Sequence, residues 1–288
     1  MSVSIPAHFV KQFSANVHLL SEQRFSRLRP CVTVGERVTG ESFTVERIGT
    51  TQSSANTVTV RHGDTPLNNT PHTRRWGFIA DYDVADLIDR QDRVKLLIDP
   101  DSSYTIKHAG VMGRTMDTTI INALEGSVIE GQNGTTTTSF PSAQQIASGS
   151  VGLTVGKLID AKKLLDAAEV EDFMDRFFVC SAEQIADLLE DDKVTSSDFN
   201  TIKALVAGQI DTYLGFKFVR SERLTSSGGA RLCYAFARPG IEFRPQTDPN
   251  SIASDRPDKR HAKQIYTFGS WGAVRKEDAM VVQVACTE

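Results

Sequence analysis

The sequence predicts an α+β fold, because helical and strand-like patterns occupy separate stretches of the chain. Apolar and small residues recur at helical spacing within residues 99–126, which predicts a buried face of Ile106, Ala109, Gly113, Met116, Ile120 and Leu124. Apolar residues alternate with polar ones over much of residues 31–80, as in half-buried strands. Residues 153–225 combine both patterns in a compact α/β region. With 288 residues, the chain can form one large domain or two modest domains with cores of their own.

Residues 1–30 are a basic, weakly amphipathic lead. Lys11, Arg24, Arg27 and Arg29 face a single acid in this stretch, which leaves an excess of three positive charges. The segment is too short to be a domain, so we expect an arm that lies on another surface.

Residues 31–80 are expected to form a long, thin β-excursion. Strand-like alternation occurs over residues 32–48 and again at residues 58–60, with polar, turn-rich sequence between and after them. Large apolar residues are too few for a separate core, and an isolated two-stranded ribbon is marginal in water. We therefore expect the excursion to pack on another chain.

Residues 78–98 mix aspartates with apolar residues and predict a short helix with a solvated acidic face. Asp81 and Asp83 match the first oxygen positions of an EF-hand loop, but Ala85 and Asp86 break its pattern. A solvated face is therefore the favoured interpretation, and a weak calcium contact is the lesser alternative.

The stretch from residue 99 to residue 126 predicts a rod-like helix. Asp99 is expected as its N-cap, Pro100 as its first residue and Gly126 as its stop. Roughly 25 residues at about 1.5 Å each give a rod of about 38 Å. Gly110 and Gly113 are candidate points of bending or close packing. A soft, Gly- and Thr-rich extended loop is expected over residues 131–150.

Residues 153–225 predict alternating helices and strands. Thr154 is expected to cap a helix that ends near Ala168. Ser181–Gln184 reads as a capping box, and Ser197 as the start of a further helix. The strands expected here and beyond are residues 177–180, 216–219, 232–237, 241–243, 264–268 and 280–285, with a polar loop over residues 246–260.

Composition excludes several classes of protein. A formal net charge of −4 gives no overall case for nucleic-acid binding. No apolar run approaches the ~20 residues of a membrane helix, and the N-terminus lacks a signal-peptide core. The four cysteines are far apart in the sequence and form no metal-ligand pair. We therefore expect free thiols in a reducing compartment, and a protein that is made in the cytoplasm.

A search for chemistry identifies no catalytic, cofactor-binding or metal-binding residue. The stretch from Val151 to Leu158 resembles a phosphate-binding loop, but its first glycine is misplaced and Leu158 stands where a hydroxyl is required. The six histidines are scattered, and the sequence leaves open a triad assembled from distant positions. Arg74, Arg75 and Trp76 form a cation–aromatic cluster, for which a protein contact is favoured over nucleic-acid binding.

The order of these parts, together with short local motifs, resembles the major capsid proteins of tailed bacteriophages with the Hong Kong 97-type fold. The resemblance covers nearly the whole chain. No single motif decides it, and none is catalytic. The similar segments are Leu28–Pro30, Tyr82–Asp89, Asp99–Pro100, Gly113–Arg114 with Asp117, Ala123–Gly126, Thr195–Asn200, Gly215–Phe216 and Gly272–Arg275.

The resemblance implies a division of the chain into capsid parts. These are an N-terminal arm (1–35), an extended β-hairpin loop (36–78), a peripheral domain with a spine helix near 100–126 and a flexible loop (79–152), an axial α/β domain (153–262), and returning strands (263–288). The last strands would join the peripheral sheet and close the axial domain.

The resemblance also implies a function, which is self-assembly into pentamers and hexamers of an icosahedral shell around double-stranded DNA. Expected partners are further copies of the chain, scaffolding and portal proteins, and possibly decoration proteins; no membrane is implied. The expected location is the virion capsid, assembled in the host bacterial cytoplasm. Candidate inter-subunit contacts are Arg24, Arg27, Arg29, Arg74, Arg75, Trp76, Asp81 and Asp83.

One departure from some members of this fold is visible directly. Their shells are cross-linked by a lysine of the extended loop, but no lysine lies between Glu36 and Ala80 here. A noncovalent lattice is therefore expected. The chain also starts directly with a plausible arm, so scaffolding is expected either from a removed segment or from another protein. An encapsulin-like cellular compartment is the main alternative, and a soluble α/β enzyme is the outsider.

Overall fold

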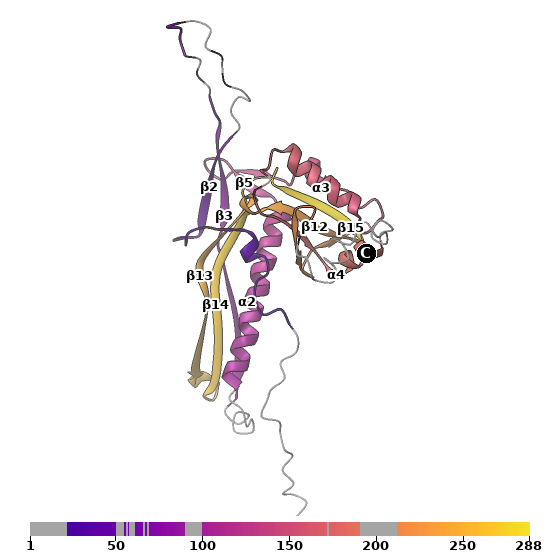
Figure 1. Ribbon diagram of the computed structural model, residues 1–288. Coiled ribbons are helices and arrows are strands. Elements are labelled where there is room, and N and C mark those ends of the chain that lie inside the picture. Colours follow the sequence, from indigo (N-terminus) through magenta and orange to yellow (C-terminus); the bar gives the residue numbers. More distant parts are fainter. Residues whose placement is uncertain are drawn as a thin grey trace, which may run out of the picture. The chain divides into compact units, whose positions relative to one another are not determined.

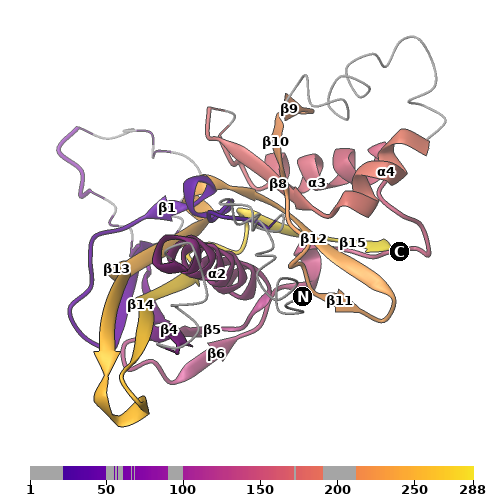
Figure 2. The same cartoon turned by 90° about the horizontal axis from the view of Figure 1, so that it is seen from below.

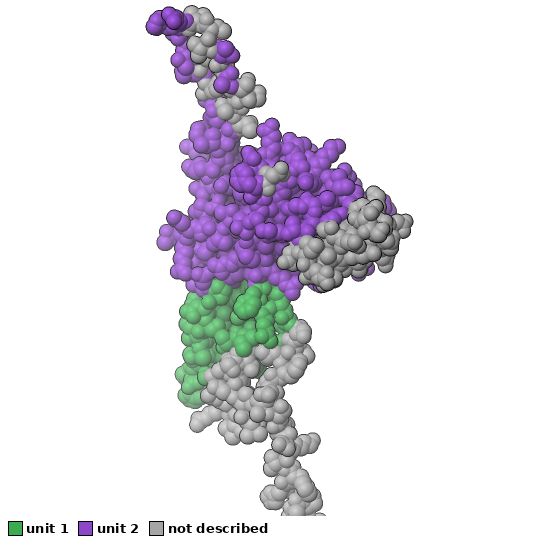
Figure 3. Space-filling model, in the orientation of Figure 1, with its two compact units in different colours: residues 1–25, 81–114, 249–269 green, residues 26–80, 115–248, 270–288 purple. Residues whose placement is uncertain are grey.

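The computed structural model describes residues 22–49, 55, 57, 61–65, 67, 69–89, 100–171, 173–190 and 212–288. The chain divides into two compact units, which Figure 3 colours separately. Unit 1 contains residues 1–25, 81–114 and 249–269, and unit 2 contains residues 26–80, 115–248 and 270–288. No helix among the described residues is both long and apolar enough to cross a membrane.

The rod predicted near residues 99–126 is confirmed as helix α2 (Pro100–Glu125), the longest helix in Figure 1. Gly126 follows it and donates its backbone N–H to the Asn122 carbonyl at 2.8 Å. The expected N-cap, Asp99, lies outside the described residues.

The buried face of α2 differs from the predicted face in the first half of the helix. Ile106 is 43% exposed, and His108 and Met112 are buried in its place. Further along, the predicted Ile120 and Leu124 are buried as expected. The predicted stripe is therefore right where the helix is most apolar and wrong where a histidine takes the inward position.

The β-excursion is a hairpin built on β2 (Ser42–Ile48) and β3 (His72–Phe78). The two strands pair antiparallel, from Ser42 opposite Phe78 to Ile48 opposite His72, and extend together in Figure 1. They belong to a four-stranded sheet of order β2-β3-β5-β6, with β5 (Val128–Glu130) and β6 (Thr136–Thr138). The strand expected at residues 58–60 lies outside the described residues.

The start of the predicted soft loop is a second hairpin, so the prediction is wrong there. Thr136–Thr138 pair with Val128–Glu130. Threonine is β-branched and favours strands, and the turn between the strands is made by two glycines with positive φ, Gly131 and Gly134. The polarity of the threonine run predicts a flexible loop, but the β-branched side chains favour strand pairing.

A small apolar core lies against this sheet in unit 2. Val38, Phe43, Val45, Val128 and Val274 are all buried there. Gly77 of β3 is required by that packing, because a Cβ at this position would lie 2.3 Å from the Phe43 ring.

A second sheet has the order β1-β13-β14-β4. Its strands are β1 (Thr33–Val34), β13 (Ile241–Arg256), β14 (Ala262–Arg275) and β4 (Ala80–Ile88).

Two predictions fail in this sheet. The acidic stretch predicted as a helix forms β4 over Ala80–Ile88, where Tyr82 and Val84 are half-buried between exposed Asp81 and Asp83. The pattern has a period of two, which is a strand period. The polar loop predicted over residues 246–260 is largely the second half of β13, where residues 250–255 are all exposed, which explains the polar composition.

The third sheet forms the core of the α/β region. Its order is β7-β15-β12-β8-β10-β9, with β11 paired to β12. The strands are β7 (Gln145–Ile146), β8 (Arg176–Cys180), β9 (Thr212–Tyr213), β10 (Phe216–Arg220), β11 (Ser226–Ser227), β12 (Ala230–Ala237) and β15 (Val281–Thr287), seen from below in Figure 2.

Two predicted caps are confirmed in this region. Thr154 accepts a hydrogen bond from the Lys157 N–H and begins α3 (Val155–Ala167). Ser181 precedes α4 (Ala182–Glu190), and its backbone N–H donates to the Gln184 side chain at 3.0 Å, which is one half of a capping box. The helix expected from Ser197 lies outside the described residues.

Lys157, in the rejected phosphate-loop pattern, has a structural role. Its ammonium donates to three backbone carbonyls, those of Ser148 at 2.9 Å, Val151 at 2.7 Å and Ala285 at 2.9 Å. The lysine thereby holds the segment before α3 against the strand β15.

Candidate functional site

The base of the β2–β3 hairpin contains a buried ionic cluster centred on Arg75. Arg75 is only 1% exposed. Its Nε donates to Glu130 at 2.5 Å, and its Nη2 donates to Asp278 at 2.6 Å. Its Nη1 also reaches the Arg275 carbonyl at 2.9 Å. A fully buried arginine is stable only when it is paired in this way.

Arg275 connects the same cluster to the end of helix α2. Its Nε donates to Asp278 at 2.6 Å, and its Nη1 donates to the carbonyls of Leu124 at 2.9 Å and Gly126 at 2.8 Å. These carbonyls lie at the negative end of the helix dipole, where a cation is favoured. The Arg275 guanidinium also stacks over Phe140 at 4.7 Å.

The cluster shifts the pKa values of its members. Burial raises the pKa of Asp278, but hydrogen bonds from Arg75 and Arg275 outweigh it and hold that pKa below its usual value. Burial lowers the pKa of Arg275, against the opposing effect of Asp278. For Arg75, the bonds to Asp278 and Glu130 outweigh burial and raise the pKa. The shifts of Asp278 and Arg75 thus both favour the charged form, whereas burial opposes it at Arg275.

Arg74 and Trp76 flank this cluster on β3. Arg74 pairs with Glu46 at 2.5 Å, and this pair is partly exposed. The Trp76 Nε1 donates to the Gly131 carbonyl at 2.8 Å. Of the predicted cation–aromatic cluster, Arg75 is thus committed within its own chain, while Arg74 remains at the surface.

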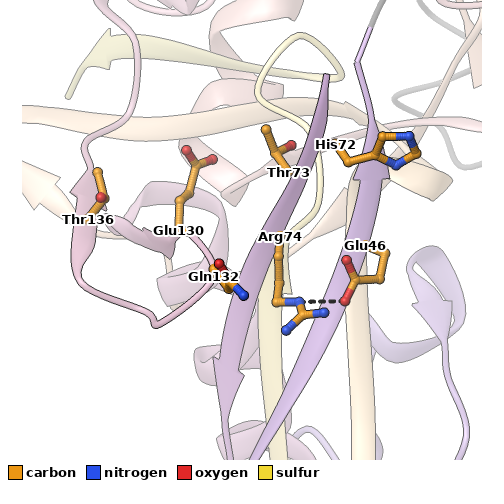
Figure 4. A pocket seen from close by; sticks show the side chains of 8 residues that line it. Glu46, His72, Thr73, Arg74, Glu130, Gln132 and Thr136 are labelled. Carbon is orange, nitrogen blue, oxygen red and sulfur yellow. Dashed lines mark hydrogen bonds and ion pairs between the residues drawn. The ribbon is translucent and has the colours of Figure 1, made fainter. Parts of the chain in front are cut away.

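A polar groove of about 460 Å³ lies beside Arg74 (Figure 4). Side chains from the hairpin and from the β5–β6 turn line it, including His72, Arg74, Glu130 and Gln132. Acids and cations are mixed along its walls, so the groove has no strong preference for one sign of charge. Its members lie at the base of the hairpin, next to the ionic cluster.

The root of the N-terminal segment is fastened to α2 through Asp117. Asp117 is fully buried. Its Oδ1 accepts from the Ser26 hydroxyl at 2.6 Å and from the backbone N–H groups of Arg27 and Leu28 at 3.0 Å each. Leu28 is itself fully buried, so the segment is held here by packing as well as by hydrogen bonds.

The three arm arginines have different environments. In unit 2, Arg29 pairs with Asp248 at 3.0 Å, and the exposed Arg27 donates to the Arg220 carbonyl at 3.0 Å. In unit 1, Arg24 is exposed. Arg29 is therefore partly used within the chain, whereas the Arg24 side chain is turned to the surface.

Gly110 permits a close approach in unit 1. A Cβ at Gly110 would lie 3.0 Å from the Gln23 carbonyl. Glu22 fixes the same segment on α2 through ion pairs with Lys107 at 2.7 Å and Arg114 at 3.0 Å. Of the two roles predicted for Gly110, close packing fits its position against the Gln23 backbone. Gly113 is buried within the helix.

Three hydrogen-bonded side chains in unit 1 have the residue types of a catalytic triad, but the hydroxyl among them is not accessible to a substrate. His108 lies 2.8 Å from Asp86 through Nε2 and 3.2 Å from the Thr267 hydroxyl through Nδ1. Thr267 is 1% exposed, so no substrate can reach its hydroxyl. These three side chains instead link β4, α2 and β14.

Other nucleophiles in the described residues are also poorly placed for chemistry. All four cysteines are free and buried. Burial raises the pKa of Cys31 to about 11 and that of Cys180 to about 12, which keeps these thiols protonated. In the part of the chain that the structure describes, no histidine, cysteine, aspartate and glutamate group is arranged to hold a metal ion.

Comparison with solved structures gives a consistent fold. The capsid of cyanophage P-SCSP1u matches with a TM-score of 0.74 at 14% identity, over 100% of this chain and 96% of that chain. The capsid asymmetric unit of cyanophage Pam1 matches at 0.71 with 15% identity, over 98% and 97%. Mycobacterium phage Che8 matches at 0.69 with 18% identity, over 96% and 97%. The predicted α+β capsid fold is confirmed.

Sequence comparison supplies the family. No curated protein matches this chain. The family model described as "Phage capsid protein" matches residues 5–288, which is nearly the whole sequence. The chain therefore belongs to the phage capsid protein family and is a structural component of a bacteriophage virion shell.

Proposed function

We propose that this chain is the major shell subunit of a tailed bacteriophage, and that its copies form the pentamers and hexamers of an icosahedral capsid around double-stranded DNA. The observation that carries the proposal is the hairpin. Its two strands extend in register, and its base is fixed by Arg75 in a buried ionic cluster. A projecting element with a rigid base suits contact with a neighbouring copy.

The parts of the chain take the roles that the capsid resemblance implies. Residues 1–35 act as the arm, 36–78 as the extended loop, 79–152 as the peripheral domain, 153–262 as the axial domain, and 263–288 as the returning strands. Different surfaces on one copy then meet their complements on the next, and such heterologous contacts close into rings.

The lattice is noncovalent in this proposal. The extended loop has no lysine to form an isopeptide bond. Exposed charges supply contacts instead, with Arg24 and Arg74 on one copy and Asp81 and Asp83 of β4 on another. Each contact is weak, but many act together in a closed shell. The proposed role is structural, without catalysis.

Further partners follow from the same role. Scaffolding and portal proteins would direct assembly in the host cytoplasm, a decoration protein could bind the finished surface, and packaged DNA would meet the basic arm through nonspecific contacts. The arm's excess of three positive charges supports the last of these.

Negative-stain electron microscopy with analytical sedimentation of the full chain tests the proposal. We expect capsomer rings, tubes or shells as the protein concentration rises. A chain that stays monomeric or dimeric at high concentration, in crowding agents and with its co-expressed structural partners contradicts it.

A charge reversal tests the contacts. Asp83→Lys on β4 is expected to reduce assembly while leaving the melting temperature of the unassembled chain unchanged. Asp160→Lys on the outer side of α3 is the matched control, since Asp160 is exposed and carries the same charge. Equal assembly of both variants would remove Asp83 from the proposed interface.

A further inference from the structure

The turn between β5 and β6 contains a chemically labile pair, Asn133–Gly134. It is the only asparagine followed by glycine in the sequence. Asn133 is exposed, and the turn joins two strands of the hairpin sheet. Gly134 has φ +64°, so the backbone after Asn133 lies in the left-handed region and carries no side chain to shield it.

The turn is held by Trp76 on both sides of Asn133. The indole Nε1 donates to the Gly131 carbonyl at 2.8 Å. A Cβ at Gly134 would lie 3.3 Å from the same nitrogen, so Gly134 packs directly on the indole. The Gly134 N–H donates to the Gly131 carbonyl at 3.3 Å, which is long for an N–H···O bond and opens at little cost.

We propose that Asn133 is a site of spontaneous deamidation and isomerisation, with water as the co-reactant. The Gly134 backbone nitrogen loses its proton and attacks the Asn133 side-chain carbonyl carbon. A C–N bond forms, the C–N bond of the amide breaks, and ammonia leaves with the proton, which gives a five-membered cyclic imide. Water then opens the imide at either carbonyl and yields aspartate or isoaspartate. No electrons are transferred.

The two products change the hairpin base in different ways. Aspartate adds a negative charge to the turn that borders the polar groove of Arg74 and Gln132. Isoaspartate also adds one carbon to the backbone between Gly131 and Gly134. Because Trp76 contacts both glycines, the longer turn cannot keep both contacts. Conversion at Asn133 is thus an irreversible, age-dependent alteration of the surface beside the extended loop.

Peptide mapping by mass spectrometry tests this on the unassembled full chain, incubated in mildly alkaline buffer. We expect the peptide containing Asn133 to convert to paired aspartate and isoaspartate forms before any other asparagine peptide, and faster as pH rises. Intrinsic fluorescence should change in parallel, because Trp76 is one of only two tryptophans and the other, Trp271, is fully buried.

Two variants make the result specific. Asn133→Gln, whose ring closure is disfavoured, should abolish both the conversion and the fluorescence change. Asn133→Asp has the negative charge from the start, so it should release no ammonia at this position. The proposal is overturned if native Asn133 stays unmodified over a period in which the denatured chain in the same buffer converts. Because the assay uses unassembled protein, its outcome is independent of whether the chain forms shells.

Discussion

The hairpin base and the arm root use arginine in opposite ways. At the hairpin base, Arg75 is buried and its guanidinium bonds to Glu130, Asp278 and the Arg275 carbonyl of its own chain. At the arm root, the exposed Arg27 has its backbone held by Asp117, while its side chain donates to the Arg220 carbonyl. Residue type alone does not tell an anchor from a contact; burial does.

The difference also concerns which groups carry the attachment. The hairpin is fixed through side chains that pair charge with charge, whereas the arm is fixed through backbone N–H groups that donate to one carboxylate. The first attachment depends on the identity of its arginines. The second leaves the Arg27 side chain exposed, with one bond to the Arg220 carbonyl.

The largest expected effect comes from breaking the hairpin base. Arg75→Leu leaves Glu130 and Asp278 without their main partner, and we expect a loss of about 3–5 kcal/mol in the free energy of unfolding. Arg74→Leu is the matched control, because its partly exposed pair with Glu46 contributes roughly 0–1 kcal/mol. Urea denaturation of both variants measures the difference. Similar values for the two would show that burial does not separate their roles.

Releasing the arm root should have the next largest effect. Asp117→Ala removes the acceptor shared by three donors and leaves the buried Leu28 N–H unsatisfied, for an expected loss of about 2–3 kcal/mol. Limited proteolysis should then cut the N-terminal segment faster than in the parent chain. Asp160→Ala, which removes an exposed aspartate of α3, is the control. An unchanged cleavage rate for Asp117→Ala would contradict this anchor.

A neutral replacement of Lys157 tests a third mode of attachment. Lys157→Met removes one donor from each of three carbonyls, and we expect a loss of about 1–2 kcal/mol in the free energy of unfolding, measured as a lower melting temperature. Lys163→Met on the same helix is exposed and should change little. If the two variants melt together, the carbonyl contacts of Lys157 contribute no net stability.

Acid should weaken the hairpin base gradually. The pKa of Asp278 is lower in the folded protein than its usual 3.8, so its stabilising contribution is complete above that value. The contribution is lost as pH falls below 3.8 and through the folded pKa. The free energy of unfolding should therefore fall less steeply with decreasing pH in Asp278→Asn than in the parent chain. If Asp278→Asn loses stability with acid as fast as the parent chain, Asp278 does not contribute to the acid sensitivity.

The sequence predicted the elements whose pattern is local. Helix α2 was visible because Pro100 and Gly126 mark its ends, and α3 and α4 because Thr154 and Ser181 cap them. Strand β4 was mistaken for a helix because its aspartates were read as one helical face. The second half of β13 was mistaken for a loop because a solvated strand is as polar as a loop.

The site was less predictable than the fold. The sequence identified Arg74–Trp76 as a cation–aromatic cluster, and the capsid resemblance included Asp117 and Arg275. Neither the cluster nor the resemblance indicated Glu130 or Asp278. Asp278 lies 203 positions from Arg75 along the chain, and no local pattern pairs residues at that separation. Only the meeting of β3, β5 and the end of β14 brings them together.

The contact of Arg275 with the last carbonyls of α2 has a mechanical consequence. Arg75, Asp278 and Arg275 form a continuous series of short bonds from the hairpin stem to the end of the helix. We therefore expect a displacement of the hairpin base to be passed through these bonds to the final turn of α2.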